Sequence, residues 1–522
     1  MKGKGDILKF RYILAIAFAL LFAACGDENV PQEDKEGGLQ QIPVVEIDIY
    51  EDYIPDEEDY HTTTSSSISD YTINLEIFPE ERTVSGVASI SFKNTSNHAL
   101  DEVFLTVPFN AFAEGFPYPP FLSTQEGRIF RHGREYGGID ITLATINLNP
   151  VDFTLDGTLL TIHLEEHLPP DASIEMGIIF EAQIPRISHR TGGNDYAMWF
   201  GNFLPKLPVL AVGNWHIYPY YPVGNPFFSA ISNYNVNITA PMEYTIVSTG
   251  FGVRNEGETN AVTSVTVNQV RDFAFAALSQ EYNSRGILTE TGIEITIYFQ
   301  GNWNDDTTLD AILETARAAF DYFESRVGTY PYQTFDIVQT DLFVQDAIKY
   351  PGIMFVDGRH LRTQAVHNSI TRDIGHQWFY NVVGNNPVTE PWLAHGLVAF
   401  LQMGLTMDED AVALHMHNLH RYLQGIINNM EHPELFRTLS HYSSWMDFYN
   451  IQFSRGKLLF YNLWQKLGED GFDQFIRTYY GRYAFSIATT RGLIAAAEEI
   501  YGESLTDFFD AWISSPLLPN ME

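Results

Sequence analysis

The side chains that can carry chemistry stand close together in one stretch of this sequence. Arg372 and His376 are four residues apart, so they share one face if the stretch is helical. His395 follows 19 residues after His376 (395 − 376), in the next apolar segment. Imidazoles and a carboxylate can hold zinc, and Asp373 is the adjacent carboxylate. Two interpretations stay open: a metal site of His376, His395 and Asp373, or a hydrogen-bonded pair of core histidines.

A helix must position the first two of these residues, and the apolar pattern predicts one over residues 362–383. Apolar residues recur there every four positions and predict a buried stripe. Gly384 is expected to end this helix, because glycine is favoured just after a helix C-terminus. A second helix, predicted over 391–405, carries His395. The stripe of the first helix consists of Val366, Ile370, Ile374, Trp378 and Val382.

The chain divides into a strand-rich part and a helical part. Short alternating segments, such as 71–77, predict half-buried strands in the first part. Helical periodicity dominates the second part, with a small strand portion at the junction. We therefore predict a β domain over 66–285, a mainly helical domain over 286–517 and a tail over 518–522. The junction strands are predicted at 293–299 and 335–338, and the other helices at 309–327, 409–428, 454–467, 470–482 and 489–500.

Two stretches of the helical part resemble the signature of the aminopeptidase N family of gluzincin zinc metallopeptidases. That signature is H-E-x-x-H-x-W-F-G-N followed by W-L-x-E-G-F-A. Residues 373–381 read D-I-G-H-Q-W-F-Y-N, and residues 392–400 read W-L-A-H-G-L-V-A-F. Other similar stretches extend the resemblance over 66–517. It implies an α+β multidomain fold, in which an N-terminal β-rich saddle or sandwich domain precedes a thermolysin-like, mainly helical catalytic-type domain.

Most residues that the family uses to bind zinc and activate water are replaced. By the resemblance, His376 keeps the position of the second ligand histidine, and Arg372 takes the position of the first. His395 replaces the ligand glutamate, and Asp373 is a remnant of the general-base glutamate, one methylene shorter. Because arginine stays protonated in proteins, Arg372 brings a fixed positive charge to the metal position.

Two positions that the family uses to hold the substrate also differ. The resemblance places Lys349, in the stretch D-A-I-K-Y, where a family glutamate binds the amino group of the substrate. A lysine repels that ammonium group. Phe453 takes the place of the tyrosine that stabilises the oxyanion. Losing one oxyanion donor typically lowers the rate by about 100- to 1000-fold.

These replacements predict a pseudopeptidase, which keeps the fold and cleft of the family without its peptidase activity. Its expected role is that of a binding or interaction module, with a peptide or protein ligand in the remnant cleft and no cofactor. An active zinc aminopeptidase with an atypical site is the main alternative, and a different hydrolase or metal-binding activity in the same cleft is the third. Zinc is expected at His376 and His395 only under these two alternatives.

Three more histidines, His415, His417 and His420, lie on one predicted helix. We interpret them as part of a solvated face. Metal binding by this group is the alternative.

The charge balance limits the partners of the folded part. The chain has 30 Lys and Arg against 66 Asp and Glu, which is a formal net charge of −36. Such a surface repels nucleic acid and anionic lipid, so we expect no nucleic-acid partner.

The first residues predict the location of the protein. Basic residues precede an apolar run that ends in L-F-A-A-C at Cys25, which resembles the lipobox of bacterial lipoproteins. We expect residues 1–25 to be a lipoprotein signal peptide and Cys25 to be lipidated. Residues 26–65 are rich in acidic side chains and predict a disordered, self-repelling tether. The folded part is therefore expected outside the cytoplasm, anchored by lipid to a bacterial membrane.

Overall fold

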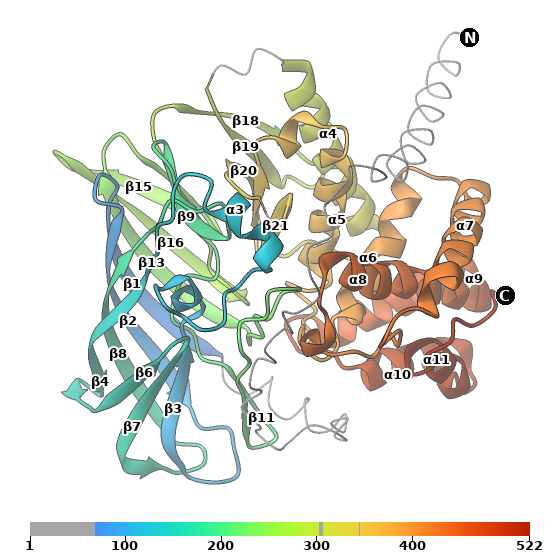
Figure 1. Ribbon diagram of the computed structural model, residues 1–522, viewed down its shortest axis with the longest axis horizontal. Coiled ribbons are helices and arrows are strands. Elements are labelled where there is room, and N and C mark those ends of the chain that lie inside the picture. Colours follow the sequence, from blue (N-terminus) through green and yellow to red (C-terminus); the bar gives the residue numbers. More distant parts are fainter. Residues whose placement is uncertain (1–67, 302–305, 344, 522) are drawn as a thin grey trace, which may run out of the picture.

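The computed structural model describes residues 68–301, 306–343 and 345–521. The predicted signal peptide with Cys25 and the predicted tether, 26–65, lie outside the described residues. In the part of the chain that is described, no helix is both long and apolar enough to cross a membrane. Figure 1 shows the strands of the N-terminal part on one side of the molecule and the C-terminal helices on the other.

An eight-stranded sheet, in the order β15-β16-β13-β1-β2-β8-β4-β5, is the base of the N-terminal part. Strand β1 forms because its alternate residues Tyr71, Ile73, Leu75 and Ile77 are buried on one face, as the alternating pattern predicts. It pairs antiparallel with β2 and parallel with β13. The strands are β1 (Ser69–Phe78), β2 (Thr83–Lys93), β4 (Gly138–Ile146), β5 (Asn149–Pro150), β8 (Ser173–Gln183), β13 (Ser232–Pro241), β15 (Gly252–Glu256) and β16 (Asn260–Val270).

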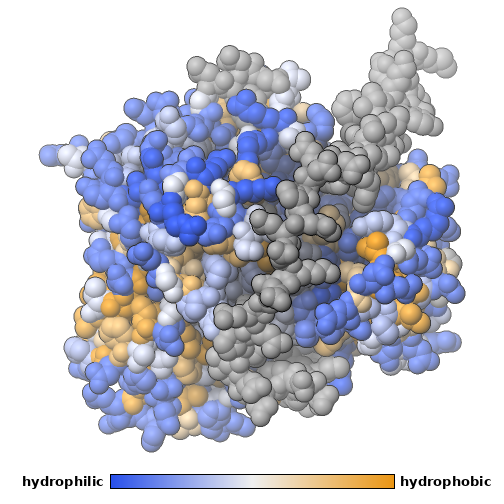
Figure 2. All heavy atoms as spheres, viewed as in Figure 1, coloured by the Kyte–Doolittle hydropathy of each residue, from blue (hydrophilic) through white to orange (hydrophobic). Residues whose placement is uncertain are grey.

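Smaller sheets complete the β domain, in the orders β3-β7-β6, β14-β17-β10-β9 and β11-β12. Aromatic rings fill the core, and Phe200 and Phe275 stack there with centroids 4.2 Å apart. Figure 2 shows mainly hydrophilic residues on one face of the molecule, with hydrophobic ones gathered over the strands. The elements are β3 (Leu100–Thr106), α3 (Glu126–Ile129), β6 (Phe153–Asp156), β7 (Leu159–Leu168), β9 (Thr191–Gly193), β10 (Ala197–Phe200), β11 (Val209–Ala211), β12 (Asn214–His216), β14 (Thr245–Ser248) and β17 (Phe275–Leu278).

A five-stranded sheet, in the order β18-β19-β20-β22-β21, joins the β domain to the helices. The two predicted junction strands are β19 and β20 of this sheet. Helix α4 (Asp306–Arg326) contacts β18 and β19. The predicted end of the β domain, position 285, lies within strand β18, which begins at Tyr282. The strands are β18 (Tyr282–Leu288), β19 (Glu294–Gln300), β20 (Thr334–Thr340), β21 (Ala347–Tyr350) and β22 (Ile353–Asp357).

The C-terminal part is mainly helical, and α5 and α6 carry the candidate site. Helix α5 packs on α4, where Trp378 stacks on Phe323 with centroids 5.5 Å apart. Helix α6 lies close to α9, because a Cβ on Gly396 would be 2.8 Å from the Cα of Gly456. The order of a β-rich and a helical part confirms the predicted α+β class. The helices are α5 (Val366–Trp378), α6 (Trp392–Leu401), α7 (Glu409–Ile427), α8 (Trp445–Phe448), α9 (Gly456–Tyr483), α10 (Thr490–Tyr501) and α11 (Thr506–Ile513).

The helix predicted over 362–383 is shorter than expected, because the structure has only α5 there. Gly384 is therefore not its C-terminal signal. The chain leaves the helix at Phe379, which is extended, and the next residue, Tyr380, has a φ of 130° that is incompatible with a right-handed helix. Val382 is buried, but it belongs to the turn after the helix.

Two other helix predictions differ in detail. The helices predicted over 454–467 and 470–482 form one element, α9, which is interrupted at Gly468 with a φ of 73°. The helix predicted over 391–405 ends as an α-helix at Leu401 and continues as a 3₁₀ turn, Gln402–Leu405. Helix ends often tighten in this way, so sequence patterns locate them less well than helix centres.

Candidate functional site

Close packing of α5 against its neighbours brings His376 and His395 together. Gly375 permits this packing, since a Cβ there would lie 2.8 Å from Val398 Cγ1 of α6 and 2.6 Å from Phe323 Cζ of α4. His376 is 0% exposed and His395 is 3% exposed. His376 Nε2 lies 3.1 Å from His395 Nδ1. The two imidazoles therefore share one buried site.

The hydrogen bonds of this pair define which ring nitrogen carries the proton. His376 Nδ1 lies 2.9 Å from the backbone oxygen of Arg372, and a carbonyl oxygen only accepts, so Nδ1 is the donor. The Nε2 of a neutral His376 then accepts a hydrogen bond from His395 Nδ1. Burial lowers the pKa of both histidines well below the usual value, and the charge of Lys349 lowers it further. Both rings are thus neutral near pH 7.

Arg372 and Asp373 form a bidentate ion pair beside the histidines. Arg372 Nε donates to Asp373 Oδ1 at 2.9 Å, and Nη2 donates to Oδ2 at 3.2 Å. Asp373 is 1% exposed, so its carboxylate is paired with arginine rather than with bulk water. Its Oδ1 lies 3.9 Å from His376 Nδ1, which is too far for a hydrogen bond. Arg372 thereby neutralises the carboxylate of Asp373.

These side chains do not fit a zinc ion as they stand. Catalytic zinc takes three protein ligands at about 2.0–2.3 Å. The nitrogens of His376 and His395 can supply two, but the nearest carboxylate, on Asp373, is held by Arg372. Within the described ranges, no three side chains of His, Cys, Asp or Glu are grouped so as to hold a metal ion. The missing element of a zinc site is the third ligand.

Lys349 enters the site from strand β21. Its side chain is 9% exposed, and its Nζ lies 4.8 Å from the centre of the Tyr380 ring. Burial lowers the pKa of Lys349 to about 7; Asp373 opposes this effect, while Arg372 and Arg190 add to it. Among the described residues, no carboxylate lies within 4.0 Å of the lysine nitrogen. A buried amine without a carboxylate partner therefore occupies this position.

Phe453 lies in a π-helix, Tyr449–Arg455, between α8 and α9. Its ring stacks on His395 with centroids 4.4 Å apart, and Tyr449 stacks on Phe453 at 5.2 Å. Single π-helical turns are frequent at functional sites. Phe453 adds an apolar wall to the histidine pair, and it has no hydroxyl that can stabilise an oxyanion.

Sequence reasoning missed two residues of this site. Tyr380 stands at the glycine of the W-F-G-N stretch, and its φ of 130° lies in the region that favours glycine. That mismatch is a signal that the sequence contains. Arg190, directly before β9, is 4% exposed and approaches from the β domain. No local pattern marks Arg190, because long-range packing brings it to the site.

The second histidine group is not the solvated face that the sequence predicts. His417 is exposed, but His415 is half-buried, and burial lowers the pKa of His415 to about 4. His420 is 8% exposed, and its Nε2 donates to the backbone oxygen of Pro519 at 2.7 Å. His420 therefore attaches helix α7 to the predicted tail.

Comparison with known proteins finds similarity to one family of peptidases. Residues 311–512 match the Peptidase family M1 domain. The chain is 20% identical to aminopeptidase N of Streptomyces lividans over 304 residues, which are 54% of this chain and 35% of that protein. It is 24% identical to aminopeptidase M1-B of Oryza sativa subsp. japonica over 244 residues, which are 43% of this chain and 27% of that protein. The matches thus span about a third or less of these curated relatives.

A solved structure extends the similarity in fold to most of the chain. The M1 zinc metallopeptidase from Deinococcus radiodurans has a TM-score of 0.63 at 16% identity, and the match covers 87% of this chain and 95% of that one. A match of this breadth includes both the β-rich part and the helical part. The M1 domain match and the aminopeptidase relatives support an aminopeptidase N-like gluzincin, and the solved structure shows the shared fold.

Proposed function

We propose that the chain is a pseudopeptidase, in which the aminopeptidase fold binds a peptide or protein ligand in its cleft without cleaving it. The observation that carries this proposal is the donor set at the metal position. His376 and His395 are hydrogen-bonded to each other at 3.1 Å, and Asp373 is paired with Arg372. Loss of one ligand leaves two histidines beside a fixed positive charge, which disfavours a divalent cation.

The residues that would act on a substrate support the same proposal. Lys349 is a base where the family has an acid, so at neutral pH its protonated form repels the α-ammonium group of a peptide. Phe453 presents a ring, stacked on His395, in place of a hydroxyl. Each change removes a separate part of the reaction, namely substrate binding and oxyanion stabilisation.

An active zinc aminopeptidase with an atypical site is the second candidate. It is favoured by one observation, the 3.1 Å between His376 Nε2 and His395 Nδ1. Two ligands of a tetrahedral zinc ion stand about 3.3 Å apart, so the pair has nearly the spacing that zinc requires. Zinc would then need its remaining ligands from water or from a carboxylate that left Arg372. A different metal-dependent hydrolase in the same cleft needs the same rearrangement.

We expect the full chain, purified without a tag in a neutral detergent, to hydrolyse an alanyl-arylamide no faster than a blank without protein. Elemental analysis of the same sample is expected to find well below one zinc per chain, because the third ligand is missing. Samples treated with a chelator and samples supplied with zinc serve as controls. Turnover that the chelator abolishes, together with one zinc per chain, would falsify the pseudopeptidase proposal.

We also propose that the protein is anchored by lipid outside the cytoplasm of a bacterium, on the basis of the residues that end at Cys25. Cys25→Ser is expected to move the protein from the membrane fraction to the soluble fraction, or to leave it with its leader uncut. Glu28→Ser, which keeps the cysteine, is the matched control and should stay with the membranes. Fractionation followed by mass measurement distinguishes these results. A Cys25→Ser protein that is cut and still membrane-bound contradicts the lipid anchor.

A further inference from the structure

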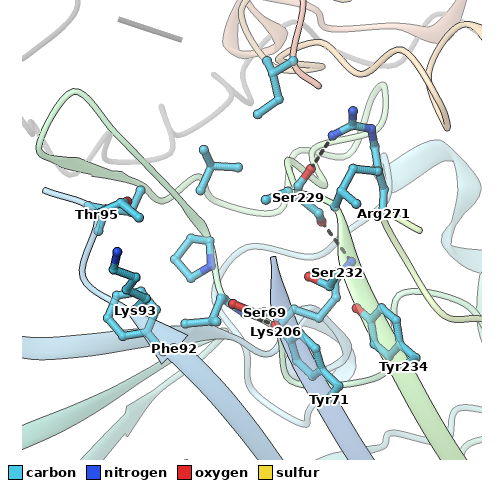
Figure 3. Close-up of a pocket in the computed structure, with 17 residues that line it drawn as sticks. Ser69, Tyr71, Phe92, Lys93, Thr95, Lys206, Ser229, Ser232, Tyr234 and Arg271 are labelled. Atoms are coloured by element: carbon cyan, nitrogen blue, oxygen red, sulfur yellow. Dashed lines mark hydrogen bonds between the residues drawn. The ribbon is translucent and has the colours of Figure 1, made fainter. Parts of the chain in front are cut away.

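A pocket lies beside the histidine site, where the β domain meets the helical domain. Arg190 reaches it from the segment before β9, Arg271 from the end of β16, Lys349 from β21 and Asn381 from the turn after α5. We call it the arginine–lysine pocket. Figure 3 shows the neighbouring pocket, in which the guanidinium of Arg271 points toward Ser229, a residue that lines both.

Hydrogen bonds hold the guanidinium groups of both arginines. Arg271 Nη1 donates to Ser229 O at 3.1 Å and Nη2 donates to Val382 O at 3.2 Å. Arg190 Nη2 donates to Asn225 Oδ1 at 2.6 Å. In each arginine the Nε is buried without a hydrogen-bond partner among the described residues. The backbone carbonyls thus fix the guanidinium of Arg271, which lines the pocket.

The positive charges of the pocket have almost no counter-charge. Arg190 is 4% exposed, Arg271 8% and Lys349 9%. Asp272 is the one carboxylate that lines the pocket within the described part of the chain. It is already engaged, because its Oδ2 lies 3.0 Å from Lys206 Nζ. Among the described residues, these three buried cations therefore have no carboxylate at ion-pair distance, although the formal net charge of the chain is −36.

Such a cluster is unfavourable unless something binds to it. A buried charge is normally paired, because desolvation of an unpaired ion costs several kcal/mol. Burial lowers the pKa of Arg271 to about 10, which reflects this penalty. Asn381 Nδ2 is a further buried donor without a partner among the described residues. The three cations and Asn381 line one pocket, and such a set of side chains is the complement of an oxyanion.

We propose that the arginine–lysine pocket binds an oxyanion, a carboxylate or phosphate group of the ligand. The inference rests on the proposed binding function and specifies its ligand class. Arg190 and Arg271 face the anion from the β domain, and the ammonium of Lys349 and the Nδ2 of Asn381 donate to it from the helical side. The ligand therefore carries a negative group beside the histidine pair, where an aminopeptidase substrate carries a positive one.

Calorimetry on the detergent-solubilised full chain tests this proposal with inorganic phosphate, succinate and the ammonium probe alaninamide, in chloride buffer of constant ionic strength. Phosphate or succinate is expected to bind one to one, and alaninamide is expected not to bind. Lys349→Gln should lower the affinity for the oxyanion by about 10- to 100-fold, because it removes one hydrogen bond to a charged group. Asn381→Ala should lower the same affinity by about 5-fold, since a neutral donor contributes less.

Lys93→Gln is the matched control, since Lys93 lines the neighbouring pocket and pairs with Asp171 at 2.7 Å. It should leave the affinity for the oxyanion unchanged. The inference is overturned if neither phosphate nor succinate binds. It is also overturned if Lys349→Gln and Asn381→Ala leave the binding intact. Those results do not touch the pseudopeptidase proposal, which depends on zinc content and turnover. Binding of alaninamide instead of an oxyanion contradicts the inference.

Discussion

Replacing Arg372 by His and His395 by Glu is expected to turn the histidine pair into a zinc site. The substitutions rebuild two imidazoles four residues apart on α5 with a carboxylate from α6. The positions suit this set, because His376 already lies 3.1 Å from the side chain at position 395. Removing Arg372 also frees Asp373 from its ion pair.

The electrostatic change at the metal position is large. One fixed positive charge leaves and one negative charge arrives. At an effective dielectric constant of about 20, each such change within 4 Å of a divalent ion is worth several kcal/mol. We therefore expect zinc to bind at least about 1000-fold more tightly than in the parent, since each factor of ten needs about 1.4 kcal/mol. Lys349 opposes part of this gain, because its charge acts on both histidines.

Calorimetric titration with zinc measures the double variant and the parent side by side. The control is the same double variant with His376→Ala, which removes the ligand that the parent already has. It should lose the gain, and this result would place the metal at the intended site. Equal and negligible binding by the double variant and the parent would mean that α5 and α6 do not present these positions to a common ion.

The order of the domains and most helices can be predicted from the sequence, because local signals determine them. Helix α10 is an example: Thr489 accepts a hydrogen bond from the backbone of Gly492 at the N-terminus, and Gly502 takes the left-handed conformation at the other end, with φ of 84°. The end of α5 is different. Its chain turns at Tyr380, and Gly384 makes room for Arg271, since a Cβ there would lie 2.1 Å from the guanidinium carbon.

The candidate site divides in the same way. Helical spacing is enough to predict that Arg372 and His376 lie near each other. Spacing does not reveal that the Arg372 side chain turns to Asp373, nor which nitrogen of His376 carries its proton. These features depend on side-chain torsions and on contacts between helices. The arginine–lysine pocket depends on contacts between segments far apart in sequence, and no periodic pattern links residue 190 to residue 349.

Replacing Lys349 by Met is expected to stabilise the ligand-free protein by about 3 kcal/mol at pH 6. Each tenfold change in proton affinity corresponds to about 1.4 kcal/mol, and burial lowers the pKa of Lys349 from 10.5 to about 7. This gives an upper value of about 5 kcal/mol, which local relaxation reduces. Methionine has a similar length and no charge, so it fills the same space without the penalty.

The pH dependence identifies the charge as the cause. At pH 6 the lysine is protonated in both the folded and the unfolded parent, so the folded state bears the full penalty of the buried charge. Between pH 7 and 10.5 the unfolded parent keeps the proton and the folded parent loses it, so the parent becomes more stable as the pH rises. The advantage of the variant should therefore be about 2 kcal/mol smaller at pH 9 than at pH 6.

Chemical unfolding of both proteins at pH 6 and pH 9, without phosphate or carboxylate in the buffer, measures this difference. Lys206→Met is the matched control, because Lys206 is also buried, at 4% exposure, but pairs with Asp272. That substitution should destabilise the protein by about 3 kcal/mol, since it leaves a buried carboxylate unpaired. A Lys349→Met variant that is no more stable at pH 6, or equally stabilised at both pH values, shows that the lysine is compensated within the fold. If the lysine is not compensated within the fold, a bound anion is the partner that can offset the free-energy cost of burying its charge.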